Sequence, residues 1–363
     1  MENIRLALNI DIRGTVISII IQKVCVIMNT LIQKLIDKLE EAPSREFKIV
    51  VMPHFCIDNF IEYGGSYESF IEMFGKIAKQ GGGNLTISQT FHMGGKAANC
   101  ASALASLGIQ TYLVARTNEL GLKLMEYFTK EKNMDLTHVG ALGKLAYTTT
   151  IELEGANVMI SDPGSLSKFG PDYLSEEDIK LIREADIVYI SDWGLNEKGT
   201  ELAQYVFGFA KENKGCKTFF DPGDPSPKRE REKEDIARLK QDVFDKGLVD
   251  IISLNLDELR RYGDLEYLRK VARVDLHTYR YARCYFKVEE TEKIPTFNVT
   301  PKRLTGAGDA WNAGDIYGKV LESTPEESLL LANANAAYYI SNSESRHPQR
   351  QDLIEFLKDK LTI

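Results

Sequence analysis

Short apolar runs alternate with amphipathic segments over most of the chain. Four such runs occupy residues 111–115, 187–191, 217–220 and 251–254, and helical patterns separate them. Continuous apolar runs of this length are typical of parallel strands that are buried on both faces. The pattern therefore predicts an α/β fold in which helices cover both faces of a parallel sheet.

Two further regions alternate apolar and polar residues, which indicates strands with one exposed face. They are residues 85–91 and 146–160, and Gly155 with Ala156 forms a tight hairpin turn within the second. A helix is predicted at residues 67–79. The three glycines at 81–83 lack the Lys-Ser or Lys-Thr that follows a phosphate-binding loop, so we interpret them as a hinge.

Residues 1–46 precede the first buried strand and form an N-terminal extension. Residues 14–21 are apolar, but Arg13 and Lys23 leave this stretch well short of the ~20 residues that a membrane-spanning helix needs. Acidic residues near the start and the lack of a small-residue cleavage site argue against a signal peptide. Residues 1–27 are either an added strand or a simple extension.

An amphipathic helix is predicted from Asn29 onwards. Asn29 or Thr30 is expected to cap this helix, and Pro43 is expected to end it. Its apolar face consists of Leu31, Ile32, Leu35, Ile36 and Leu39. Such a face packs on another apolar surface, which here is either the body of the protein or a partner.

The composition is that of a globular protein. Hydrophobic residues make up 43% and charged residues 27% of the 363 residues, which argues against disorder. The formal net charge of −8 argues against a nucleic-acid-binding surface as the main function. The five cysteines are scattered without a Cys-x-x-Cys pair, which favours reduced thiols and a cytoplasmic location over a disulfide framework or a zinc site.

Candidate chemistry appears at residues 304–314, which read Leu-Thr-Gly-Ala-Gly-Asp-Ala-Trp-Asn-Ala-Gly. Gly306, Ala307 and Gly308 let the backbone approach a ligand at the start of a predicted helix, where unpaired N–H groups and the helix dipole favour a phosphate. Asp309 is then a candidate general base, which takes the proton of a hydroxyl as that hydroxyl attacks the terminal phosphate of a nucleotide. Taken alone, the motif is equally compatible with a glycine turn and a helix cap.

A second glycine motif occupies residues 92–99, which read His-Met-Gly-Gly-Lys-Ala-Ala-Asn and lead into a small-residue helix that ends at Gly108. Together the two motifs resemble the ribokinase family, also called PfkB carbohydrate kinases, over about the last three hundred residues. Members of this family phosphorylate sugars, sugar phosphates and nucleosides with a nucleoside triphosphate. The resemblance implies a ribokinase-like three-layer α/β/α sandwich at residues 47–363, with the two alternating regions as a small β-strand lid over the sugar.

The resemblance also implies roles in substrate binding and catalysis. The first strand, read at residues 50–58, ends in an acid that binds substrate hydroxyls, and two glycines and an amide line the sugar pocket. In this chain these substrate-binding residues are Asp58, Gly94, Gly95 and Asn99. Asp309 is implied as the base, and the backbone N–H groups of Gly306, Ala307 and Gly308 as the anion hole.

For the nucleotide and the metal, the resemblance points to the second half of the chain. The Asn-x-x-Glu element at 255–258 is similar to the family's site for phosphate and Mg²⁺, with Asn255 at the nucleotide and Glu258 at the metal through water. The alternative for this element is a helix cap with a first-turn acid. Thr305 belongs to the second signature, and Asn335 lies at 334–337, which resembles the helix beside the adenine site.

Two segments depart from the family pattern. Residues 274–282 lack the glycines of the family's Thr-Leu-Gly-x-x-Gly, which leaves the phosphoryl donor open. His277 in this segment either contacts a phosphate of the nucleotide or is only hydrogen-bonded locally. Leu304 stands where many relatives carry an acid of a monovalent-cation loop, so potassium activation is not expected.

Several polar residues follow the predicted strands directly. Asp58, Asp192, Asp221 and Asn255 are expected at the carboxyl edge of the sheet, where ligands bind in such folds. Lys96 either balances substrate charge or lies on the surface. The charged run at 228–240 is interpreted as a solvated helix face.

The sequence thus predicts a phosphotransferase that uses ATP and Mg²⁺ to phosphorylate a hydroxyl of a small sugar or sugar-derived substrate. A nucleoside kinase is the first alternative, because four aromatic side chains are suited to stacking on a base, namely His54, Phe55, His92 and Trp193. A sugar-binding regulator without catalysis is the second alternative. A dinucleotide oxidoreductase is excluded because no Gly-x-Gly-x-x-Gly follows the first strand. The expected partners are small molecules and, through the lid strands, a second copy in a homodimer, with no nucleic acid or membrane.

Overall fold

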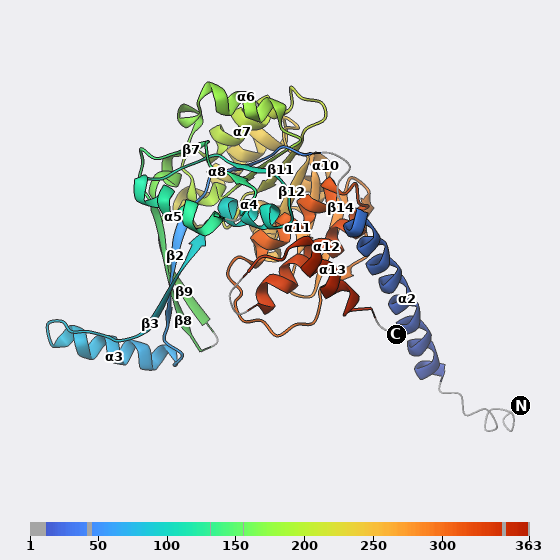
Figure 1. Ribbon diagram of the computed structural model, residues 1–363, viewed down its shortest axis with the longest axis horizontal. Coiled ribbons are helices and arrows are strands. Elements are labelled where there is room, and N and C mark those ends of the chain that lie inside the picture. Colours follow the sequence, from blue (N-terminus) through green and yellow to red (C-terminus); the bar gives the residue numbers. More distant parts are fainter. Residues whose placement is uncertain (1–11, 42–45, 131, 155, 343–345, 362–363) are drawn as a thin grey trace, which may run out of the picture.

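The structure, a computed structural model, describes residues 12–41, 46–130, 132–154, 156–342 and 346–361. Within these residues a central sheet lies between two layers of helices, and a second, smaller sheet projects from the body (Figure 1). The predicted three-layer α/β/α sandwich with a β-strand lid is confirmed.

The central sheet consists of the strands β1 (Ile49–Met52), β4 (Thr111–Leu113), β6 (Met134–Asp135), β10 (Ile187–Ser191), β11 (Lys217–Asp221), β12 (Ile251–Leu254), β13 (Arg273–His277), β14 (Tyr281–Phe286), β15 (Glu289–Glu290) and β16 (Ile294–Pro295). Their order is β15-β14-β13-β12-β11-β10-β1-β4-β6, and β16 pairs with β14. From β13 to β6 all neighbours are parallel, whereas β14 runs antiparallel to β13, β15 and β16. The predicted parallel sheet therefore describes the centre and not the β14 edge.

Two groups of helices cover the two faces of this sheet. One face carries α2 (Ile12–Glu41), α4 (Lys96–Ser106), α5 (Glu119–Thr129), α11 (Ala307–Val320), α12 (Pro325–Ser341) and α13 (Arg350–Lys358). The other face carries α6 (Glu176–Glu184), α7 (Gly199–Ala210), α8 (Glu232–Leu239), α9 (Leu256–Tyr262) and α10 (Leu265–Val271). Short 3-10 or π turns lie at η1 (Gly164–Lys168), η2 (Pro171–Tyr173), η3 (Trp193–Leu195), η4 (Ser226–Arg231) and η5 (Lys240–Phe244).

The apolar runs of the sequence supply both cores at once. In β1, Ile49 and Val51 point into the core of the α11 face, while Val50 and Met52 point into the core of the α7 face. All four side chains are buried, and burying each contributes roughly 1.5–3 kcal/mol. This two-sided burial explains why the strand has no polar alternation.

The lid is a four-stranded sheet with the order β3-β2-β8-β9. Its strands are β2 (Cys56–Glu62), β3 (Ser88–Gly94), β8 (Ala146–Leu153) and β9 (Ala156–Asp162). The strand predicted at 85–91 lies three residues later, because the pairing with β2 begins at Ser88 and residues 85–87 belong to no strand. The predicted hairpin pairs β8 with β9, although Gly155 at its turn is outside the described residues. A separate short pair, β5 (Ala115–Arg116) and β7 (Val139–Gly140), continues from β4.

Two sequence interpretations near the lid are wrong. Asp58 does not end the first strand, because β1 stops at Met52 and the chain then enters the lid strand β2, where Asp58 is the third residue. The glycines at 81–83 are not a hinge between lid and body. They link β3 to the predicted helix α3 (Tyr67–Lys79), an insertion in the lid that has no buried residue and projects far from the body (Figure 1).

The N-terminal helix is longer than predicted. α2 extends from Ile12 to Glu41, so residues 12–27 are helical and not an added strand. Thr30 lies inside the helix and donates its hydroxyl to the carbonyl of Val26, so neither Thr30 nor Asn29 is a cap. The predicted end of the helix at Pro43 and residues 1–11 of the extension lie outside the described residues.

α2 packs on the body of the protein through its C-terminal half. Ile32, Leu35, Ile36 and Leu39 are buried against α12 and α13, as the apolar face predicted, and the first half of the helix reaches away from the body (Figure 1). No helix in the described part of the chain is both long and apolar enough to cross a membrane.

The charged run at 228–240 contains one buried lysine. Lys228 in η4 donates a hydrogen bond to the carbonyl of Asn196, and its Nζ lies 4.5 Å from the centre of the Trp193 ring. Burial lowers the pKa of this lysine. The interpretation of the run as a solvated face is therefore wrong for Lys228. The cysteines with described side chains, Cys56, Cys100, Cys216 and Cys284, are buried and unpaired.

Candidate active site

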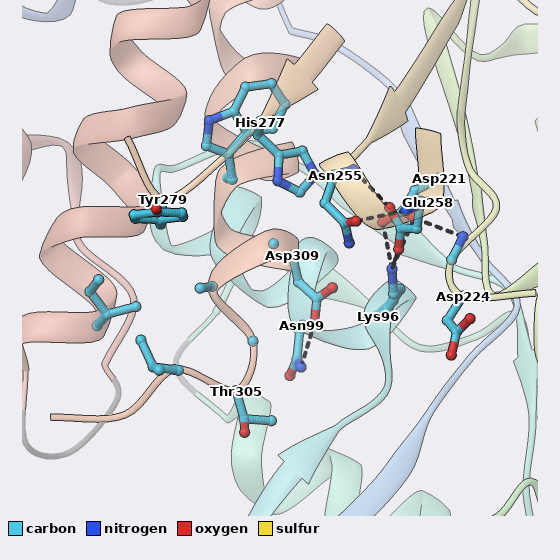
Figure 2. Close-up of a pocket in the computed structure, with 18 of the residues that line it drawn as sticks. Lys96, Asn99, Asp221, Asp224, Asn255, Glu258, His277, Tyr279, Thr305 and Asp309 are labelled. Carbon is cyan, nitrogen blue, oxygen red and sulfur yellow. Dashed lines mark hydrogen bonds and ion pairs between the residues drawn. The ribbon is translucent and has the colours of Figure 1, made fainter. Parts of the chain in front are cut away.

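A pocket of about 1320 Å³ opens at the carboxyl ends of the parallel strands, between the lid and the N-terminus of α11. Asp192 follows β10, Asp221 ends β11 and Asn255 follows β12, and all three line this pocket, as their places after strands predicted. The lid contributes Asp58 from β2. Both sequence motifs therefore meet at one site, which Figure 2 shows in part.

Asp309 lies in the middle of the site, in the first turn of α11. Its carboxylate is buried and accepts a hydrogen bond from the Asn99 amide of α4 (2.9 Å), which joins the two motifs across 210 positions of the chain (Figure 2). The N-cap of α11 is Gly306, and no side chain caps this helix. Asp309 is therefore not a helix cap.

Burial raises the pKa of Asp309 to about 7. The charge of Lys96 and the hydrogen bond from Asn99 oppose this shift, while the negative charges of Asp221 and Asp192 add to it. A carboxyl group with a pKa near 7 is poised to accept a proton at neutral pH, which is the property of an efficient general base.

We expect the rate of the predicted phosphoryl transfer to rise with pH through the pKa of Asp309. Because a base acts only when deprotonated, log(kcat/KM) should fall by about one unit per pH unit below pH ~7 and level off above it. Asn99→Leu removes a hydrogen bond that lowers this pKa, so the midpoint should move to higher pH. Ser106→Ala, on the same helix but bonded only to the Ser102 carbonyl, is the control. An unchanged midpoint in the Asn99 variant would contradict the assignment.

Two of the three predicted anion-hole donors remain available. Gly306 has φ +87°, which glycine adopts without strain and which turns the chain into α11. The N–H of Ala307 already donates to the carbonyl of Leu304 (3.1 Å), so this predicted donor belongs to a turn. In the part of the chain that the structure describes, the N–H groups of Gly306 and Gly308 have no protein acceptor.

Lys96 is a half-buried partner of carboxylates and not a free surface lysine. Its Nζ donates to both oxygens of Asp221 (2.9 and 3.1 Å) and lies 3.7 Å from Glu258 Oε1. Burial lowers the pKa of Lys96, but the attraction of Asp221 and Glu258 outweighs it and leaves the pKa well above its ordinary value. The lysine thus stays charged. Asp221 also accepts from the Asn312 amide of α11 (2.8 Å), so this ion pair is fixed to the helix that carries Asp309.

Asn255 and Glu258 form the helix cap that was the alternative interpretation. Asn255 Oδ1 accepts from the N–H groups of Asp257 and Glu258 (2.9 Å each), and Glu258 Oε2 accepts from the N–H of Asn255 (2.9 Å). Both side chains still line the pocket, and Glu258 Oε1 faces Lys96. Burial raises the pKa of Glu258, and nearby Asp221 and Asp224 add to the rise.

The lid end of the pocket contains Asp58, whose carboxylate accepts from the Cys56 thiol (3.1 Å). Burial raises the pKa of Asp58. Gly94 on β3 lies directly against this carboxylate, and any Cβ at Gly94 would overlap it. Gly95 is the N-cap of α4 with φ +91°, and a Cβ there would lie 2.8 Å from the His54 carbonyl oxygen. Gly94 does not line the pocket. Because it has no side chain, it leaves space for the Asp58 carboxylate.

Only one of the four aromatic residues considered for base stacking lines the pocket. His54 does, and its Nδ1 lies 2.8 Å from Asp192 Oδ2, so the ring is held by an acid. Phe55 and Trp193 are buried elsewhere, and His92 on β3 packs edge-on against Phe60. The predicted stacking platform for a nucleoside substrate is therefore not formed by these residues.

The opposite end of the pocket lies beyond Asp309, between the β13–β14 turn and α12. His277 ends β13 with its ring 4.8 Å from that of Trp311, and burial lowers the pKa of His277 to about 4. It is therefore neutral at pH 7. Thr305 lines this end of the pocket. Asn335 does not, because its amide is buried against the Ala310 carbonyl in the α11–α12 interface, and Asn333, Ala336 and Ala337 line the pocket instead.

A sequence model of the pfkB carbohydrate kinases matches residues 68–265, more than half of the 363 residues. The chain belongs to this family. A 5-dehydro-2-deoxygluconokinase of Geobacillus thermodenitrificans is 26% identical over 281 residues, which cover 72% of this chain and 81% of that protein. This pfkB chain is therefore a carbohydrate kinase.

Solved structures of other kinases share the fold of this pfkB carbohydrate kinase. A ribokinase of Arabidopsis thaliana, complexed with ribose and ATP, is 20% identical with a TM-score of 0.67, and the match covers 86% of this chain and 99% of that one. A fructokinase of Xylella fastidiosa with bound ATP is 17% identical with a TM-score of 0.69 and covers 87% and 99%. An adenosine kinase of Sinorhizobium meliloti is 18% identical with a TM-score of 0.67 and also covers 87% and 99%. At these identities the likeness shows the fold alone.

Sequence reasoning did not assign Lys96 or Asp221 a role. The strand-end position of Asp221 was a visible signal, since the acid directly follows a buried run. Lys96 gave none, because only the fold brings it within 2.9 Å of a residue 125 positions away.

Proposed function

We propose that this carbohydrate kinase transfers the γ-phosphate of ATP to a hydroxyl of a small sugar or sugar-derived substrate, with Asp309 as the base. The observation that carries the proposal is the position of the buried Asp309 carboxylate between the lid end of the pocket and the glycines of α11. The substrate oxygen attacks the γ-phosphorus, its proton passes to Asp309, and the bond from the γ-phosphorus to the bridging oxygen of ADP breaks. The products are ADP and a phosphate ester.

The backbone at Gly306 and Gly308 is proposed to bind the transferring phosphoryl group. Two N–H groups without protein acceptors at a helix N-terminus suit the charge that builds on those oxygens. The neutral His277 next to Gly308 can donate a further hydrogen bond to a phosphate oxygen without adding charge.

Magnesium is proposed to bind at Glu258 through water molecules and the nucleotide phosphates. No cluster of three or more acidic, histidine or cysteine ligands occurs among the residues described, which fits a hard cation that keeps most of its waters. The donor chemistry fits as well, since Glu258 Oε1 accepts no hydrogen bond from the residues that the structure describes and lies near the acidic groups Asp221 and Asp224. When bound, the ion neutralises phosphate charge.

A sugar is favoured over a nucleoside as the substrate. The lid end presents Asp58, Asn99 and Thr148, which can hold vicinal hydroxyl groups, whereas of the four aromatic residues considered for base stacking His54 alone lines the pocket. The Geobacillus relative, named for a sugar-derived acid, supports the same class. A second copy is proposed to pair with this chain through the lid, because α3 and the outer strands expose Phe74, Phe91 and Ile160.

We expect ADP to form when the protein meets Mg-ATP and a suitable polyol. The panel contains pentoses, hexoses, sugar acids including 5-dehydro-2-deoxygluconate, and nucleosides, and coupled ADP release is the measurement. Turnover with a sugar or sugar acid is the predicted result. Turnover with nucleosides alone would show that the nucleoside alternative holds, and substrate binding without turnover for any donor would show a non-catalytic regulator.

A further inference from the structure

The turn between β13 and β14 places two unusual side chains at the nucleotide end of the pocket. Tyr279 and Arg280 both line the pocket, in the segment where the family's glycine loop is missing. Tyr279 is 79% exposed, which is rare for a tyrosine that lines a deep pocket. Figure 2 places Tyr279 and Lys96 on opposite sides of Asp309, so Tyr279 is remote from the carboxylate-rich part of the site.

The turn that carries these residues is held firmly by hydrogen bonds. The Thr278 hydroxyl donates to the Tyr281 carbonyl (2.8 Å) and accepts from the N–H groups of Arg280 and Tyr281. Across the pocket edge, the Thr296 hydroxyl donates to the Tyr279 carbonyl (3.0 Å), and the Thr296 N–H donates to the Arg280 carbonyl (3.0 Å). The backbone is thus fixed while the Tyr279 ring is left open on the pocket side, which is the arrangement of a preorganised stacking surface.

The surroundings of the ring suit a flat apolar ligand. Ala336, Ala337 and Ile340 of α12 line the same end of the pocket, together with Phe297 and Val299 of the loop after β16. Small and aliphatic side chains on one wall and an exposed ring on the other form a slot for a heterocycle. The Arg280 guanidinium lies 5.0 Å from the centre of the Tyr279 ring, which supports the ring by a cation–π contact.

Arg280 is also a positively charged side chain in the pocket that is available to bind a ligand. The pocket is lined by acids at Asp58, Asp192, Asp221, Asp224, Glu258 and Asp309, and the other basic side chain, Lys96, is committed to Asp221 and Glu258. Within the described residues Arg280 makes no ion pair with a carboxylate. A polyanion that enters this acidic pocket therefore meets one uncommitted guanidinium, which can bind phosphate with two parallel hydrogen bonds.

We propose that Tyr279 and Arg280 form a clamp for the phosphoryl donor, in which Tyr279 stacks on the base of a nucleoside triphosphate and Arg280 binds its polyphosphate. The clamp replaces the glycine loop that relatives place here, so a side-chain site substitutes for a backbone site. It makes the donor a base-bearing nucleotide and not a simple polyphosphate. The inference rests on the proposed ATP-dependent function.

The test compares the binding of Mg-ATP and of inorganic tripolyphosphate, which lacks a base, to the full chain by calorimetry and by inhibition of turnover. Tyr279→Leu should weaken ATP binding about tenfold and leave tripolyphosphate binding unchanged, whereas Tyr279→Phe should behave as the wild type. Arg280→Gln should weaken both ligands by a similar factor, and Arg280→Lys should restore part of the loss. Tyr127→Leu on α5 and Arg183→Gln on α6, an exposed tyrosine and an exposed arginine that do not line the pocket, are the matched controls.

Several outcomes would overturn the clamp. Equal ATP affinity in Tyr279→Leu and wild type would remove the stacking role, and an equal loss for ATP and tripolyphosphate would reduce Tyr279 to a structural support of the turn. Unchanged tripolyphosphate binding in Arg280→Gln would remove the phosphate role. Wild-type protein that binds sugar but no nucleotide would instead overturn the proposed function itself, so the two failures are distinguishable.

Discussion

Asp309→Asn is expected to lower kcat by about 10²–10⁴, the range over which a positioned general base acts. The amide keeps the size of the side chain and can still hydrogen-bond to Asn99, but it cannot accept the proton of the substrate hydroxyl. Because the lid residues that we propose to bind the sugar are unchanged, the KM for the sugar should change little. Initial rates of ADP release at saturating and limiting sugar separate the two parameters.

The melting temperature of Asp309→Asn shows whether this variant is folded. The folded-state pKa of Asp309 is raised, so its ionised form disfavours the folded state, and that cost grows as pH rises from about 4 towards 7. Asp309→Asn should therefore melt at or above the wild-type temperature at pH 8. Asp257→Asn, an exposed acid on α9, is the matched control and should leave both rate and melting unchanged. A fully active Asp309→Asn protein would contradict the mechanism.

Gly306→Ala is expected to lower kcat by about 10²–10³, comparable to the loss of one anion-hole donor. The backbone at Gly306 has φ +87°, and a Cβ there would lie 2.6 Å from the Tyr339 hydroxyl, which donates to the Thr305 carbonyl. The turn must shift to relieve this contact, which moves the N–H groups that we propose to bind the phosphoryl group. Stability should also fall, by about 1–2 kcal/mol, because a side chain disfavours this backbone conformation.

Rates and urea unfolding of Gly306→Ala are the measurements. Gly208→Ala in α7 is the matched control, because nothing lies within 4 Å of a Cβ built there and alanine favours a helix. A Gly306→Ala enzyme that lost stability but kept its rate would show that the turn does not orient the phosphoryl group.

The hydrophobic pattern of the sequence predicted the central strands correctly, because a strand that is buried on both faces consists mainly of apolar residues. Every residue of β10 and β12 is buried, so both strands consist mainly of apolar residues, with one serine each. The N-terminal helix was predicted too short because its first part has no amphipathic pattern. Residues 14–21 are apolar on all sides, so they carry no helical period, although the structure places them inside α2.

The sequence predictions for the site were wrong where the position of a single residue decides whether its side chain reaches the pocket. Residues 50–58 read as one strand, but the chain leaves the central sheet after Met52 and pairs Asp58 with His92 in the lid, a choice made by distant partners. On α12, Asn335 points into the helix interface while Ala336 lines the pocket, because neighbouring helical residues differ by about 100° in direction. The ion pair of Lys96 with Asp221 required the whole fold.

The parallel pairing of β2 with β8 in the lid affects how the enzyme reaches its native state. Cys56 pairs with Ala146 and Glu62 with Glu152, contacts that span about ninety residues and enclose α4 and two strands of the central sheet. Such a pairing forms only after a long loop is closed, which slows folding relative to hairpins. The hairpin of β8 and β9 can form early, but the strand bearing Asp58 joins it late. The lid surface that carries Asp58 is therefore completed only after residues 146–152 have been synthesised, and a nascent chain shorter than about 155 residues lacks it.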